Sequence, residues 1–130
     1  MITVARGVLL ESKAALEALG KVYVPIGKEN YWFVKTLSKL QQAMKANSKI
    51  SGKESNRLVE EFGTAQPNGR KGILQTDVEA MESYSEGMDA HMAIPVQIDI
   101  KQLTLTQLKE AQVSLVANDQ VSLMWLFSEE

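Results

Sequence analysis

The hydrophobic pattern is most regular between residues 28 and 62, where apolar side chains recur at the spacing of an α-helix. On a helical wheel the apolar residues share one narrow sector, and lysines fall almost opposite. The apolar residues are Phe33, Leu37, Leu40, Met44, Leu58 and Phe62, and the lysines are Lys28, Lys35, Lys39 and Lys53. The pattern predicts one long amphipathic helix, or two stacked ones, that stops at Gly63.

The apolar sector is interrupted in the middle of this segment. Asn47, Ser48, Ser51 and Ser55 stand where apolar residues are expected. Two interpretations are open: the helix leaves its own core or bends at Gly52, or it is a projecting arm that another subunit covers. The second interpretation makes the three serines candidate interface residues.

Shorter elements are predicted before the long helix. Alternating apolar and polar residues from Ile2 predict a short edge strand. A helix is expected over Leu9 to Leu19, with Gly20 placed to end it. The segment from Lys21 to Gly27 then reads as a linker.

After the long helix, Asn68 and Gly69 predict a tight turn, followed by a short strand over Gly72 to Gln75. Thr76 and Glu79 have the spacing of a capping box, which predicts a helix that begins there. We expect its buried face to carry Val78, Met81, Ser85, Met88 and Met92.

Two further elements are predicted near the C-terminus. The alternation of Ile94, Val96, Ile98 and Ile100 predicts a half-buried strand. The segment from Asn118 to Phe127 predicts an N-capped helix that is apolar almost all round, with Trp125 largely buried in the fold or in an interface. The expected fold is therefore a single α+β domain over residues 1–130, mainly helical, with one long central helix, two to three shorter helices and a small antiparallel sheet.

Composition and charge narrow the class of protein. The absence of cysteine excludes disulfides and thiolate metal sites, and neither a signal peptide nor a membrane span is expected. Residues 1–62 carry ten Lys/Arg against six Asp/Glu, whereas residues 63–130 carry four against ten. The opposite charges either favour head-to-tail self-association into a homo-oligomer or neutralise each other within one monomer.

Catalytic groups are scarce. His91 is the one histidine, and its place near a helix C-terminus favours a role toward the helix dipole or solvent over catalysis. Glu82, Glu86 and Asp89 share a helix face, and we interpret them as a solvated acidic face because matching ligands on other helices are missing. We expect neither an enzyme nor a bound metal or cofactor.

One group of residues has the composition of a ligand surface. Aromatic rings among cations can stack bases and pair with phosphates, and here they are Lys28, Tyr31, Trp32, Lys35 and Lys39. The alternative, which we favour, is that Trp32 packs beneath the first helix. Nucleic acid is not an expected partner because the second half is acidic and the isoelectric point lies near 5.5.

The motifs "VPIG", "VEEFG", "VQIDIKQL" and "WLFSEE", in this order along the chain, resemble a family of small tailed-phage proteins known as a domain of unknown function, number sixteen-seventeen. The resemblance implies phage origin and a non-enzymatic role, and it carries over no functional residues. We therefore expect a minor virion component or assembly factor that contacts phage or host proteins, in the host cytoplasm or in the virion. The alternative is an anti-defence protein that sequesters a host nucleotide signal or inhibits a host defence protein.

Overall fold

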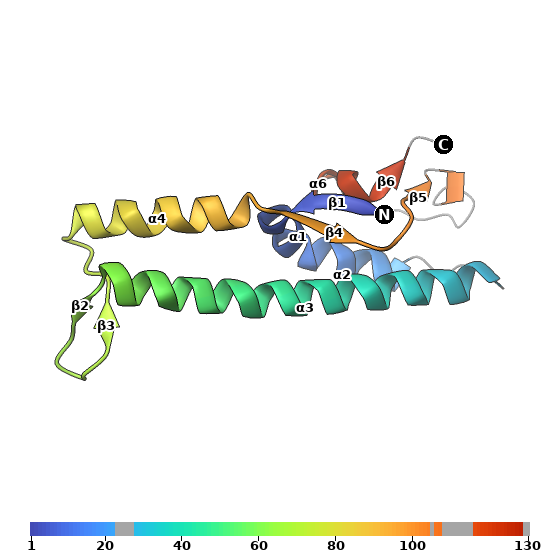
Figure 1. The fold of residues 1–130 in the computed structure, drawn as a ribbon. Helices are drawn as coiled ribbons and strands as arrows, with labels where there is room; N and C mark the ends of the chain where they lie inside the picture. Colours follow the sequence, from blue (N-terminus) through green and yellow to red (C-terminus); the bar gives the residue numbers. More distant parts are fainter. Residues whose placement is uncertain (23–27, 105, 108–115, 129–130) are drawn as a thin grey trace.

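The computed structural model describes residues 1–22, 28–104, 106–107 and 116–128 and shows a mainly helical α+β fold built on one long helix. This helix, α3 (Lys28–Phe62), extends along the whole molecule, and α4 (Val78–Met92) returns beside its C-terminal half (Figure 1). Apart from the two short strands that connect α3 to α4, the other described helices and strands gather around its N-terminal half (Figure 1). We call α4, residues 47–62 of α3 and the connection between them the arm, and the remainder the body.

Helix α3 confirms the strongest prediction from the sequence. It contains 35 residues and ends at Phe62, next to Gly63, which corresponds to a length of about 52 Å at 1.5 Å per residue. The expected bend is wrong, because the helix continues through Gly52 (Figure 1).

The predicted turn lies at the end of the arm. Strands β2 (Thr64–Ala65) and β3 (Lys71–Gly72) pair antiparallel. Gly69 between them has a φ of 80°, a conformation that glycine adopts without steric cost. The strand after the turn is shorter than expected and begins one residue earlier, at Lys71.

Helix α4 is present as predicted, but it begins one residue later than expected, and its cap and its buried face differ from the prediction. Asp77 replaces Thr76 as the N-cap, because its carboxylate accepts a hydrogen bond from the amide of Ala80 at 3.1 Å. Val78 and Met81 are 61% and 42% exposed. The face that meets α3 instead carries Ala80, Tyr84, Gly87 and His91.

This face follows helical spacing, but its residues are small or polar. Gly87 allows a close approach, since an added Cβ would lie only 2.7 Å from a terminal carbon of Leu58 on α3. The methionine side of α4 was predicted to be buried because methionine is usually a core residue. It is not the contact face, because the part of α3 that α4 meets is itself polar.

The body contains a two-stranded antiparallel sheet formed by distant segments. Strand β1 (Ile2–Ala5) pairs with β4 (Pro95–Ile98), with Ile2 opposite Ile98 and Val4 opposite Val96. Both strands agree with the predictions from alternating residues.

The predicted helix after β1 is divided into α1 (Arg6–Glu11) and α2 (Lys13–Val22). Ser12 lies at the break, where its hydroxyl oxygen is 2.6 Å from the carbonyl oxygen of Val8 and 3.1 Å from that of Ser122. The prediction that Gly20 ends the helix is wrong, since α2 continues past it. The predicted linker lies mostly at residues 23–27, outside the described residues.

The C-terminal segment is less helical than expected. Helix α6 (Ala117–Ser122) is followed by a 3₁₀ turn, η1 (Met124–Leu126), and by β6 (Phe127–Ser128), which pairs parallel with β5 (Leu103–Thr104). The predicted cap at Asn118 is wrong because the helix begins at Ala117.

Trp125 is only half-buried, and its indole N–H donates to the Ser12 hydroxyl oxygen at 3.0 Å. The fully buried side chains of this segment are its neighbours Leu123 and Leu126. They complete a core that also contains Ile2, Val4, Leu9, Ala15, Leu16, Leu19, Phe33, Leu40, Met44, Ile98, Ile100 and Leu103.

Candidate functional site

A cluster of polar side chains joins the body to the arm. The Arg6 guanidinium in α1 donates from Nε to Oδ1 of Asn47 at 2.9 Å, and its Nη1 lies 3.0 Å from Nδ1 of His91. On the other side, the hydroxyl of Ser51 lies 2.8 Å from Nε2 of His91. These contacts link α1, α3 and α4 at one point.

For His91 we expected a role toward the helix dipole or solvent; it lies in the last turn of α4 but is buried, with 7% of its surface exposed. Burial, and then the charge of Arg6, hold the pKa of His91 below its ordinary value, so the ring is neutral near pH 7. A serine–histidine pair that attacks a substrate needs a group that stabilises the imidazolium, and here the neighbouring group is a cation. We therefore interpret the cluster as a junction between the body and the arm.

The polar interruption in α3 is explained by contacts within the chain. Asn47 and Ser51 belong to the junction, and the hydroxyl of Ser55 lies 2.6 Å from that of Tyr84 in α4. Ser51 and Ser55 therefore contact α4 of the same chain, in the place where one interpretation of the sequence expected a second subunit. Ser48 differs from them because it is exposed.

The predicted ligand surface is divided by the fold. Trp32 packs against the body core and, with Lys35, Lys39 and Lys101, lines a cavity of about 320 Å³. Trp32 shares this cavity with residues at the end of the β1–β4 sheet. The core against which it packs includes Leu9, Leu16 and Leu19 of the first two helices.

Tyr31 is not among the residues that line this cavity, and Lys35 and Lys39 each have a further contact with a neighbouring residue. Tyr31 is 66% exposed, and Nζ of Lys35 lies 5.1 Å from the centre of its ring. Nζ of Lys39 donates to the backbone oxygen of Asp99 at 3.1 Å. The side chain of Lys28 is outside the part of the chain that the structure describes.

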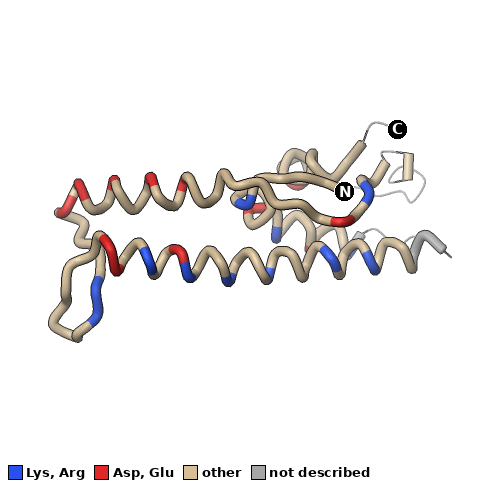
Figure 2. Tube along the Cα trace, viewed as in Figure 1, with Lys and Arg blue, Asp and Glu red and all other residues tan. Residues whose placement is uncertain are grey.

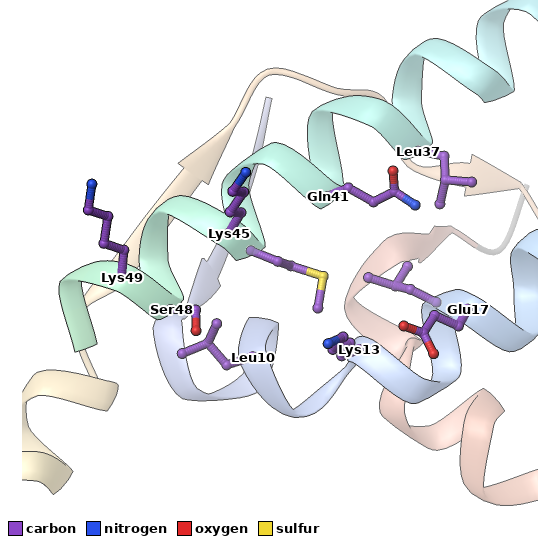
Figure 3. A pocket seen from close by; sticks show the side chains of 10 residues that line it. Leu10, Lys13, Glu17, Leu37, Gln41, Lys45, Ser48 and Lys49 are labelled. Atoms are coloured by element: carbon purple, nitrogen blue, oxygen red, sulfur yellow. The ribbon is translucent and has the colours of Figure 1, made fainter. Parts of the chain in front are cut away.

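A larger groove runs between the first two helices and α3, with a volume of about 660 Å³ (Figure 3). Its apolar lining comes from Leu10, Leu16, Leu37 and Met44, and its polar lining from Lys13, Glu17, Gln41, Lys45, Ser48 and Lys49. Of these lining residues, Ser48 alone was among the candidate site residues predicted from the sequence. The groove arises from the angle between helices, and no local pattern predicts that angle.

Helices α3 and α4 carry opposite net charge, although the basic excess of α3 lies in the body, because residues 47–62 hold three Lys/Arg and three Glu (Figure 2). Helix α4 has four Asp/Glu and no Lys/Arg, whereas α3 has seven Lys/Arg against four Asp/Glu. Among the described residues, the ion pairs on α3 join Arg57 to Glu54 and Glu61, Lys71 to Glu60 and Lys39 to Asp99, and none reaches α4. The carboxylates of α4 therefore remain unpaired on an exposed face.

Comparison with known proteins gives no relative from which a function could be transferred. No protein-family model matches the chain, and no curated protein or solved structure matches it either. In the described ranges, no helix has both the length and the hydrophobicity of a membrane span. Within the same ranges, no group of three or more His, Cys, Asp and Glu side chains could hold a metal ion.

Proposed function

We propose that this protein acts through protein–protein contacts, including contacts between its own copies, as a phage-encoded minor virion component or assembly factor. The observation that carries the proposal is the acidic face of α4 in the arm, which forms no ion pair among the described residues, together with the basic excess that α3 carries in the body. If the charges of α3 and α4 served to neutralise each other within one monomer, we would expect ion pairs between the two helices. The separation of these charges leaves them available to a second molecule.

The exposed apolar residues of the arm support the same proposal. Val78 and Met81 lie one helical turn apart on α4 and are both exposed, and Leu74 is exposed just before them. Apolar side chains beside charged ones are typical of surfaces that bind other proteins. The resemblance to a phage family adds the biological setting.

The first test is the dependence of the molecular mass on salt. We expect light scattering after size exclusion to show an oligomer at low ionic strength that dissociates as salt screens the charges. Mass spectrometry of purified phage particles then decides whether the protein is a virion component or acts during assembly. A monomer at every salt concentration that is also missing from the particles would contradict the proposal.

A second candidate function is sequestration of a host nucleotide signal. It is favoured by the cavity that Trp32 shares with three lysines, since an aromatic ring and cations together suit a base and its phosphates. Calorimetry against cyclic nucleotides tests it, with Trp32→Ala as the variant and Trp125→Phe as the control. Absence of both heat and a nucleotide absorbance in the purified protein would exclude this function.

The related possibility, inhibition of a host defence protein, is tested by recovering the tagged protein from infected cells. A stoichiometric host protein in the recovered complex would support it. Recovery of phage proteins alone would favour the role in the virion or in its assembly.

A further inference from the structure

We infer that the groove between α2 and α3 binds helix α4 of a second copy of this chain. The inference rests on the self-association proposed above and names the two surfaces that would meet. Three observations support it: the chemistry of the groove, the chemistry of α4, and the geometry that separates them within one molecule.

The groove combines an apolar floor with a basic rim. Leu16, Leu37 and Met44 line it from both helices, and their side chains supply an apolar contact surface. Lys13 contributes to the lining from α2, while Lys45 and Lys49 contribute from α3, with the Lys49 side chain directed outward at the rim (Figure 3). Glu17 is the one carboxylate in the lining. A groove of this kind favours an amphipathic helix with acidic residues beside its apolar face.

Helix α4 has this composition on its exposed side. Glu79, Glu82 and Glu86 are exposed, and among the described residues none of them forms an ion pair. Val78 and Met81 lie next to these carboxylates on the wheel and are exposed as well. Methionine adapts its shape to irregular apolar surfaces, which suits it to insertion between two helices.

The dimensions of the two surfaces agree. The groove follows α3 from Leu37 to Lys49, about 18 Å at 1.5 Å per residue. The exposed side of α4 from Val78 to Asp89 covers about 16 Å by the same measure. Its apolar and acidic residues can therefore lie along the groove for most of its length.

The α4 helix of the same molecule is already placed elsewhere. It contacts the C-terminal half of α3 through Tyr84, Gly87 and His91, and Figure 1 shows it beside that half, away from α2. The occupant must therefore come from another copy. Because two different surfaces meet, the contact closes as a dimer only if each copy gives and receives an arm, and otherwise it builds a ring or a chain.

The experiment exchanges the charges of the two surfaces. One variant carries Lys13→Glu, Lys45→Glu and Lys49→Glu in the groove, and the other carries Glu79→Lys, Glu82→Lys and Glu86→Lys on α4. All six side chains are exposed, so both variants should fold, which circular dichroism can verify. A control with Lys21→Glu, Lys53→Glu and Arg70→Glu has the same net charge as the groove variant but changes exposed residues outside the groove.

Sedimentation analysis then measures association of each protein alone and of the two variants mixed. We expect the dissociation constant of each variant alone to rise by more than about tenfold, because like charges meet at the contact. An equimolar mixture should regain association, since lysines on one α4 then meet glutamates in the other groove. The control should associate much like the natural chain, apart from the smaller effect of its net charge.

The outcomes separate this inference from the proposed function. If the natural chain associates and the groove variant associates equally well, the groove is not the contact, while self-association stands. If the mixture of the two variants fails to associate, the pairing of groove and α4 is wrong. If the natural chain is monomeric throughout, self-association itself fails, and the groove inference falls with it.

Discussion

The body and the arm are stabilised in different ways. Nearly all buried apolar side chains belong to the body core, which draws on β1, α1, α2, α3, β4, β5 and the C-terminal segment. In the arm, the described buried apolar residues are Leu58 and Ala80. The arm is joined instead by polar pairs, Ser55 with Tyr84 and Ser51 with His91, and by the close approach at Gly87.

This difference bears on function. Burial of apolar surface is the dominant favourable term in folding, whereas a single hydrogen bond contributes only about 0.5–1.5 kcal/mol. The body therefore supplies most of the stability. The arm is a pair of helices with limited stability of its own, and its outer faces are left for contacts with other molecules.

The largest effect is expected in the body. Leu123→Ala removes a side chain with no exposed surface and should lower the free energy of unfolding by about 2–5 kcal/mol. Urea denaturation followed by circular dichroism measures it. Leu74→Ala, at an exposed position of the arm, is the control and should change little. Equal effects of the two substitutions would contradict the contrast between body and arm.

The next effect concerns the junction. Arg6→Ala leaves polar groups of Asn47 and His91 without a partner and should cost about 1–3 kcal/mol. In the Arg6→Ala variant, hydrogen exchange of the α4 amides should be faster than in the natural chain. The amides of β1 and β4 should change less. Arg57→Ala, which breaks only exposed pairs, is the control. Equal protection of α4 in the natural chain and the Arg6 variant would show that the junction does not hold the arm.

Two glycines of the arm should respond differently to alanine. Within the described residues, a Cβ at Gly52 meets no heavy atom within 4 Å, so Gly52→Ala should stabilise α3 by about 1 kcal/mol. Gly87→Ala should lose this gain, because its Cβ would press on buried Leu58. Thermal unfolding of both variants measures the difference, and an equal rise in the melting temperature would refute close packing at Gly87.

The smallest effect is a dependence on pH. Since the pKa of His91 is lowered from 6.5 in the folded chain, the unfolded chain binds the proton first as the pH falls. Stability should therefore be complete above about pH 6.5 and decrease below it. His91 is the only histidine, so His91→Gln should flatten the stability between pH 7 and pH 5, and an unchanged slope would contradict a buried neutral ring.

The contrast between body and arm also explains which features the sequence could predict. Helix α3, the turn at Gly69 and strands β1 and β4 follow from patterns within each segment, and all of them are present. The sequence did not predict which face of α4 contacts α3. The small and polar residues of that face are recognisable as a contact surface only once their partners on α3, Ser51 and Ser55, are known.

Other features depend on residues that are distant in the sequence. The break at Ser12 coincides with contacts to Ser122 and Trp125, more than a hundred positions away. The lysine-rimmed groove appears only when α2 is placed against α3. For the predicted ligand surface, the sequence identified Trp32 and its neighbouring lysines but not that Tyr31 would be exposed outside the lining of their cavity.

The contacts of Ser12 have a consequence for synthesis on the ribosome. The arm closes between residues 29 to 40 positions apart, as at Ser55 with Tyr84 and Ser51 with His91. The body needs Ser12 to meet Ser122, 110 positions later, and loop closure slows the formation of such distant contacts. The helical pair of the arm can therefore assemble on the nascent chain before Leu123 and Leu126 are synthesised, whereas α1 and α2 pack fully only after these two residues complete the core. A chain ended after residue 104 should show helical circular dichroism without a cooperative melting transition.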